Sequence, residues 1–191
     1  MVDLAEIQTA YYMVAATGVL VAAVFYIINL RETAKNRRVA LTTSLMQSFI
    51  SEEGSKRFME LMNMEWKDMS DFDKKYDSSV NLDNFAKRNT LWNTCEILGY
   101  QYRCGLIDFG TLWAICNNAV PTTYVKFKPV LDEYKRRGWH PQNMYENFEY
   151  LAFEISRKME KMDPSFKASG VFKSDEYYEA FRRGKSVYTS Q

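Results

Sequence analysis

The most unusual ionisable residue of the chain is Glu96, which lies among apolar residues in the segment Trp92–Tyr102. A carboxylate buried there needs a partner, or its pKa rises. On a helix, Asn93 and Arg103 lie on or near its face, and Arg88 is an alternative partner. Two interpretations stay open: a structural ion pair or hydrogen-bond network, and a polar pocket of Asn93, Glu96 and Arg103 that binds a ligand.

Other residue patterns for catalysis or metal binding are missing from the sequence. The single histidine, His140, has no nucleophile placed near it, and we expect a partly exposed packing residue. The three cysteines (Cys95, Cys104 and Cys116) contain no CxxC pair and form no recognised zinc spacing with His140. Phosphate-binding glycine loops, GxSxG and HExxH are also missing. We therefore expect no catalytic set, no metal and no cofactor, and reduced, mostly buried thiols.

The charge balance argues against nucleic acid as a partner. Lys and Arg number 25 and Asp and Glu number 24, which gives a net charge of +1. A basic patch does occur at 126–137, and basic residues interleave with aromatic residues at 124–137. Such a basic run is more often a solvated helix face. The aromatic residues, 15% of the chain, are expected to pack in a core.

These residues must be positioned by helices, because apolar residues recur mainly at spacings of three and four and no strand pattern is convincing. The strongest soluble helix is expected over 82–104. Further helices are expected at 51–62, 109–119, 122–137 with a kink or restart at Pro129, and 141–162. Pro121 is expected to end the helix at 109–119. The fold class is therefore all-α, a compact bundle of about five to six helices.

Residues with capping chemistry mark several helix ends. Ser51 and Asp108 are expected to be N-caps, and Ser70 is a possible one. Gly105 is expected to adopt the left-handed conformation after the 82–104 helix, with Leu106 packing back in a Schellman-type stop.

Ahead of this bundle, the segment Ile7–Leu30 contains no charged side chain over 24 residues. As a helix it would extend roughly 36 Å, enough to cross a hydrocarbon core of about 30 Å. A cleaved signal peptide would need a positive N-terminal flank, whereas this flank carries Asp3 and Glu6. A buried core helix rarely runs so far without a charge. We therefore predict one N-terminal transmembrane helix.

Four basic residues follow the apolar run and predict its orientation. Arg31, Lys35, Arg37 and Arg38 stand against one acid, Glu32. Positive loops stay in the cytoplasm, so the N-terminus should lie outside the cell membrane and the large C-terminal part in the cytoplasm. The same residues are expected to touch anionic lipid headgroups.

Within the apolar run, small residues form one face that favours helix association. Ala15, Gly18 and Ala22 match the small-xxx-small pattern, which lets a second helix approach closely. The plainer interpretation is that Ala and Gly are common in membrane helices.

Two motifs carry a resemblance to a known family. Trp92–Gly99 and Arg103–Asp108 (sequences WNTCEILG and RCGLID) resemble those of a family of uncharacterised prokaryotic, often archaeal, proteins. The anchor and its flank are similar too, and so is Trp139–Leu151, in the last long helix. The resemblance covers about residues 8–160. It implies one N-terminal membrane helix, a small all-helical domain and no known activity.

These observations divide the chain into an anchor (1–30), a basic juxtamembrane helix (31–50), a cytoplasmic helical domain (51–162) and a polar tail (163–191). The expected function is a non-catalytic, membrane-tethered interaction module, either a scaffold or an accessory subunit. Its expected partners are the bilayer and other membrane protein subunits, or further copies of itself. The alternative is a membrane-bound enzyme or ligand sensor that uses a pocket around Glu96. A pore built from several anchors has little support, since the span holds no ionisable residue.

Overall fold

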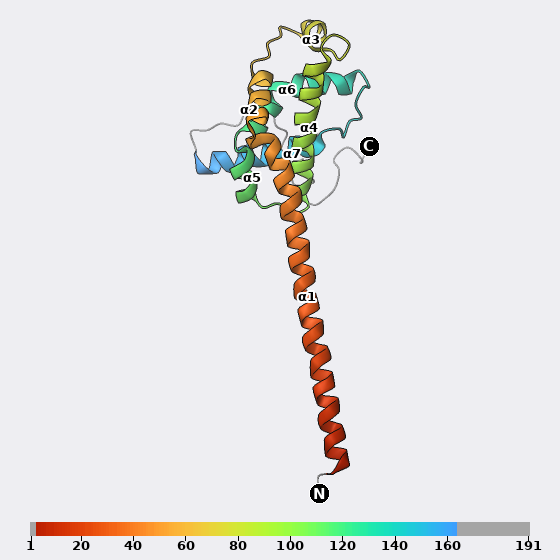
Figure 1. Cartoon of the computed structure of the whole chain (residues 1–191). Helices are drawn as coiled ribbons and strands as arrows, with labels where there is room; N and C mark the ends of the chain where they lie inside the picture. Colours follow the sequence, from red (N-terminus) through yellow and green to blue (C-terminus); the bar gives the residue numbers. More distant parts are fainter. Residues whose placement is uncertain (1–2, 164–191) are drawn as a thin grey trace. The chain divides into compact units, whose positions relative to one another are not determined.

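All regular structure in the described part of the chain is α-helical (Figure 1). This computed structural model describes residues 3–163, and in α1 the side chains of some residues, among them Lys35, Arg37 and Arg38, lie outside the description. The helices are α1 (Leu4–Ile50), α2 (Glu52–Met62), α3 (Met69–Tyr76), α4 (Leu82–Arg103), α5 (Phe109–Cys116), α6 (Ala119–Arg136) and α7 (Glu146–Met162). The predicted class, an N-terminal apolar helix followed by a helical domain, is confirmed.

The chain forms two compact units, Met1–Thr43 and Ser44–Gln191. In the first unit, Ile7–Ala34 is long and apolar enough to cross a membrane, and its described side chains are exposed. Length and composition fit a membrane span and also an N-terminal signal sequence. The anchor segment and the basic flank form one continuous helix, α1, which ends at Ile50.

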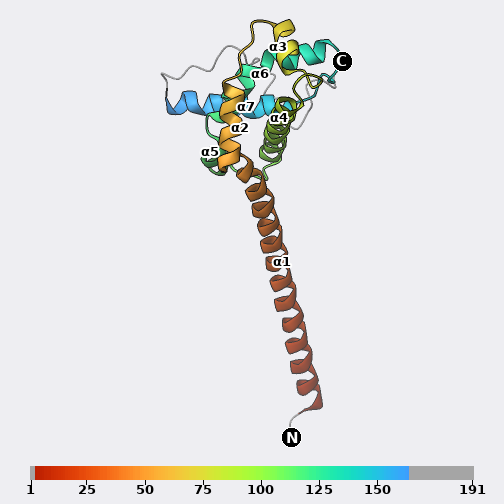
Figure 2. The same cartoon turned by 45° about the horizontal axis from the view of Figure 1, so that its top comes forward.

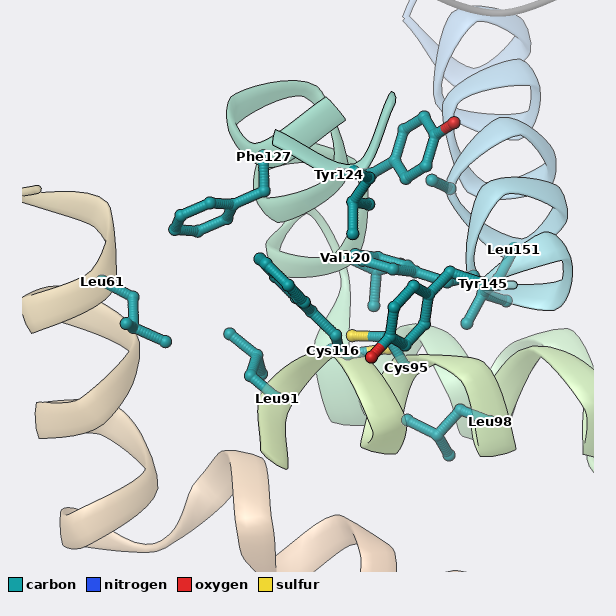
Figure 3. Close-up of a cluster of buried hydrophobic side chains, with 14 of the residues drawn as sticks. Leu61, Leu91, Cys95, Leu98, Cys116, Val120, Tyr124, Phe127, Tyr145 and Leu151 are labelled. Atoms are coloured by element: carbon teal, nitrogen blue, oxygen red, sulfur yellow. The ribbon is translucent and has the colours of Figure 1, made fainter. Parts of the chain in front are cut away.

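The second unit is built around α4 and α7, which cross in both views (Figures 1 and 2). α6 packs on α7, while α2 and α3 pack on α4. Figure 3 shows side chains from α2, α4, α5, α6 and α7 meeting in one core. Its fully or nearly fully buried members include Leu61, Phe72, Leu91, Trp92, Cys95, Leu98, Val120, Phe127, Phe148 and Leu151. This core fixes the crossing of α4 and α7 that positions Glu96.

Several helix ends follow the capping chemistry expected from the sequence. Ser51 Oγ accepts a hydrogen bond from the Gly54 amide at 3.0 Å, and Asp108 Oδ1 accepts one from Thr111 at 2.9 Å. Gly105 has φ +68°, and the next amide, of Leu106, donates to the Gln101 carbonyl at 2.8 Å. This is the predicted Schellman stop. At α3, however, the cap is Asp68 rather than Ser70, because Asp68 Oδ1 accepts from the Asp71 amide.

The proline positions differ from the expectation. α5 already ends at Cys116, and Pro121 lies in the first turn of α6, where a missing amide hydrogen costs no helical bond. Pro129 lies inside a continuous α6. The last long helix begins at Glu146 instead of Pro141, because Tyr145 has φ +61° and breaks the helical run.

Candidate functional site

Glu96 of α4 caps the N-terminus of α7. Its two carboxylate oxygens accept hydrogen bonds from the Asn147 side-chain amide and from the Phe148 backbone amide, both at 2.7 Å. The first amides of a helix have no partner within the helix, and Tyr145 at the N-cap position supplies no side-chain acceptor. Glu96 therefore supplies from another helix the acceptor that α7 lacks.

Gly99 makes this contact possible one turn further along α4. A Cβ atom at Gly99 would lie 2.1 Å from the Asn147 carbonyl oxygen and 2.6 Å from its carbonyl carbon. No real side chain tolerates such a distance, so only glycine lets the start of α7 approach α4 this closely. Glu96 and Gly99 thus act as one docking device, here called the α4–α7 clamp, with Asn147 and Phe148 as its other half.

Two opposing effects act on the pKa of Glu96, namely burial and the hydrogen bonds by which it caps α7. Burial raises the pKa of Glu96, and the hydrogen bonds from Asn147 and Phe148 oppose that rise. The nearby Glu146 also raises the pKa of Glu96. The partial positive charge at a helix N-terminus favours a carboxylate at this place. Burial and the charge of Glu96 raise the pKa of Tyr145 to about 12, and the Tyr145 hydroxyl donates to Asn89 Oδ1 at 3.1 Å.

The three residues of the expected polar pocket have different surroundings. Asn93 is exposed on α4, Arg103 is half-buried at its end, and Glu96 is turned to α7. The hydrogen bonds of Glu96 favour the structural interpretation of this residue. A ligand pocket of Asn93, Glu96 and Arg103 stays a prediction.

Arg88 is the buried charge that sequence reasoning named only as an alternative partner of Glu96. Its side chain is fully buried, and Nη2 donates to the Tyr76 carbonyl at 2.6 Å while Nε donates to Asn84 Oδ1 at 2.8 Å. Nη1 reaches the Tyr134 hydroxyl at 3.4 Å. Because Tyr76 is the last residue of α3, the guanidinium satisfies a helix C-terminus and joins α3, α4 and α6.

Aromatic rings complete the surroundings of Arg88. Its guanidinium carbon lies 4.7 Å from the centre of the Phe72 ring and 5.4 Å from that of Trp92. Such cation–π contacts gain strength where water is excluded. The 3.6-residue periodicity places Arg88 on the same face as Leu91, Trp92 and Cys95, but its charge alone favoured an exposed position.

His140, Cys95 and Cys116 are packing residues in this fold. The His140 ring contacts Tyr134 and Tyr145 edge-to-face, and burial lowers its pKa. Cys95 and Cys116 are buried and lie together in Figure 3, and burial raises the pKa of both thiols, that of Cys116 to about 12. Cys104 is exposed. Within residues 3–163, no group of three or more His, Cys, Asp or Glu side chains is arranged to hold a metal ion.

Lys126 joins the end of α2 to α6. Its Nζ donates to the carbonyls of Met62 and Met64 at 2.8 and 2.7 Å and lies 5.2 Å from the centre of the Trp66 ring. An open surface hollow of about 570 Å³ lies beside it, lined by Met64, Glu65, Trp66, Lys67, Asp71, Lys75 and Lys126. Two of its three lysines are engaged, Lys126 with the carbonyls of Met62 and Met64 and Lys75 with Asp71 at 2.8 Å. Lys126 is therefore a helix-end cap rather than a free cation.

The residues expected to meet lipid or another helix lie on α1. Ala15, Gly18 and Ala22 are exposed, and no atom lies within 4 Å of a Cβ built at Gly18. Arg31 is exposed, while Lys35, Arg37 and Arg38 belong to α1 with side chains outside the description. Helix association and lipid contact at these positions stay predictions.

Comparisons with curated proteins and with solved structures found no match. One family model matches residues 13–154, a stretch that begins within α1 and ends within α7. It includes all four residues of the α4–α7 clamp. That match covers well over half of the 191 residues. The chain belongs to the family described as a domain of unknown function, DUF4760.

Proposed function

We propose that this chain is a single-pass membrane protein whose helical domain is a non-catalytic interaction module on the cytoplasmic side. The observation that carries the proposal is α1, in which Ile7–Leu30 is uncharged and its described side chains are exposed. Such a surface is stable in lipid and unfavourable in water. The basic residues from Arg31 to Arg38 support an N-terminus outside the cell membrane.

The helical domain supports a role in binding rather than in catalysis, because its main buried or partly buried polar side chains serve as caps of helix ends. Glu96 caps α7, Arg88 closes α3, and Lys126 caps α2. Each of these groups is engaged within the fold. The alternative function, an enzyme or ligand sensor with a pocket around Glu96, would require this carboxylate to leave α7.

The experiment is purification of the full chain from native membranes in a mild detergent, followed by mass spectrometry of the co-eluting proteins. A stoichiometric protein partner that survives high salt would make the chain an accessory subunit. Elution as an oligomer of itself would make it a self-assembling scaffold. Elution as a monomer with no partner, both in detergent and after cross-linking in the membrane, would refute the interaction module.

A further inference from the structure

The imidazole of His140 fills a slot between two tyrosine rings in the connection from α6 to α7. Its ring centre lies 5.2 Å from that of Tyr134, near the end of α6, and 5.5 Å from that of Tyr145, both edge-to-face. The backbone amide of His140 also donates to the Tyr134 carbonyl, at 3.3 Å. His140 therefore joins the last turns of α6 to Tyr145, the N-cap residue of α7.

The slot suits the neutral imidazole better than the charged one. His140 Nδ1 is shielded from water and has no hydrogen-bond partner among the described residues. An imidazolium donates from both ring nitrogens, and a buried charged donor without an acceptor costs far more free energy than a buried neutral nitrogen. Burial accordingly lowers the pKa of His140, and the charge of Lys135 lowers it further.

The charged groups around the ring do not offset a charge on His140. The titratable and charged groups on the elements around it are Tyr134 and Lys135 of α6, Arg137 of the connection, Tyr145 and Glu146 at the start of α7, and Arg88 and Glu96 of α4, which act on Tyr134 and Tyr145. Lys135 is the group whose charge acts on the imidazole, and it opposes a second positive charge. The oxygens of Glu96 are occupied at the start of α7.

Tyr145 links the state of His140 to the α4–α7 clamp. Its φ of +61° is a left-handed conformation, which a tyrosine keeps only where its surroundings hold it. The ring is held by His140, by Trp92 at 5.8 Å between ring centres, and by a hydrogen bond to Asn89 Oδ1 at 3.1 Å. Because Tyr145 directly precedes α7, loss of one of these contacts loosens the helix start that Glu96 caps.

We propose that His140 is a pH-sensitive latch on the start of α7. In its neutral form the ring fills the slot between Tyr134 and Tyr145, and in its protonated form it leaves the slot for water and releases Tyr145. The α4–α7 clamp is then firm at neutral pH and loosens in mild acid. The latch lies within the helical domain, so it goes beyond the proposed function and does not depend on the membrane anchor or on a partner.

The first test is the titration of His140, which is the single histidine of the chain. The NMR signal of its ring, recorded from the full chain in detergent with isotope-labelled histidine, should titrate with a lower midpoint in the folded protein than in concentrated urea. Because the folded pKa lies below 6.5, the stability that neutral His140 supplies is fully present above pH 6.5 and is lost as the pH falls through the folded pKa. A folded midpoint equal to or above the midpoint in urea would overturn the proposal.

The second test compares wild type with His140→Phe, which keeps a ring in the slot but takes up no proton. Amide hydrogen exchange of both full chains is followed by mass spectrometry at about pH 7.5 and about pH 5.5. We expect equal exchange over residues 137–150 at the higher pH, and exchange at least three times faster in wild type at the lower pH. Both proteins keep Glu96, so its own titration cancels in the comparison.

The helix α2 is the internal control of this experiment, because its exchange should be equal in the two proteins at both pH values. Equal exchange over residues 137–150 at the lower pH would overturn the latch. An equal acceleration of α2 in wild type would also overturn it, since the whole domain and not the start of α7 would then open. The first test uses wild type alone, so it decides the matter even where His140→Phe does not fold.

Discussion

Replacing Gly99 by alanine tests the α4–α7 clamp directly. The added Cβ would lie 2.1 Å from the Asn147 carbonyl oxygen, whereas ordinary van der Waals contact begins at 3.4 Å. The start of α7 must therefore retreat by about 1.3 Å, which follows from these two distances. A retreat of that size lengthens the two 2.7 Å hydrogen bonds from Asn147 and Phe148 to the Glu96 carboxylate to about 4 Å, which is beyond hydrogen-bonding range.

The cost follows from the two lost bonds. Leaving a buried carboxylate and a helix amide unpaired costs about 1–3 kcal/mol for each group. Alanine recovers about 1 kcal/mol of helix propensity over glycine. We expect a net loss of about 1–5 kcal/mol in the free energy of unfolding, which lowers the thermal midpoint by roughly 3–15 °C for a domain of this size.

The assay is thermal unfolding of the full chain in detergent, followed by tryptophan fluorescence. Gly110→Ala is the matched control, because Gly110 also lies in a helix and a Cβ there meets only Asp108 Oδ1, at 3.2 Å. Its midpoint should stay within about 3 °C of wild type. A Gly99→Ala midpoint equal to that of Gly110→Ala would refute the close approach of α7 to α4.

Three further predictions concern other buried groups. The pKa of Glu96 is raised above 4.5 in the folded state, so the stabilisation by protonated Glu96 is fully present below pH 4.5 and is lost as the pH rises through the folded pKa. In urea titrations at several pH values, the free energy of unfolding of wild type relative to Glu96→Gln should therefore fall over that range. A constant difference between the two proteins would contradict the raised pKa. Arg88→Ala should lower the free energy of unfolding by about 3 kcal/mol, measured by urea unfolding, because it leaves the Tyr76 carbonyl unpaired and opens a cavity. Arg136→Ala is the control, since Arg136 is exposed, and equal stabilities of the two variants would disprove the role of Arg88. A maleimide should label one thiol per folded chain, Cys104, and three after denaturation, as counted by intact mass; rapid labelling of Cys95 or Cys116 in the folded chain would argue against their burial.

The sequence predicts those features of the fold that depend on local chemistry. Ser51, Gly105 and Asp108 end or begin helices as expected, because caps act within three or four residues of their position. The start of the last helix was missed, since the left-handed conformation of Tyr145 has no local signature in a residue other than Gly or Asn.

Of the residues that form the α4–α7 clamp, only Glu96 was singled out from the sequence. Glu96 stood out because a carboxylate among apolar residues needs a partner. Its partners Asn147 and Phe148 are about fifty residues away, and no periodicity links them. Arg88 shows the same limit, because its hydrogen-bond partners Tyr76 and Tyr134 come from α3 and α6 rather than from its own helix. The family membership agrees with the resemblance seen in the sequence, while its often archaeal origin stays a prediction.

The most direct test of the membrane-tethered account is alkaline carbonate extraction of native membranes, followed by the intact mass of the protein in the pellet. The account predicts that the chain stays in the pellet with Ile7–Leu30 still attached, because this segment spans the bilayer. Release into the supernatant, or a mature chain that lacks this segment, would contradict it and identify Ile7–Leu30 as a surface helix or a cleaved signal.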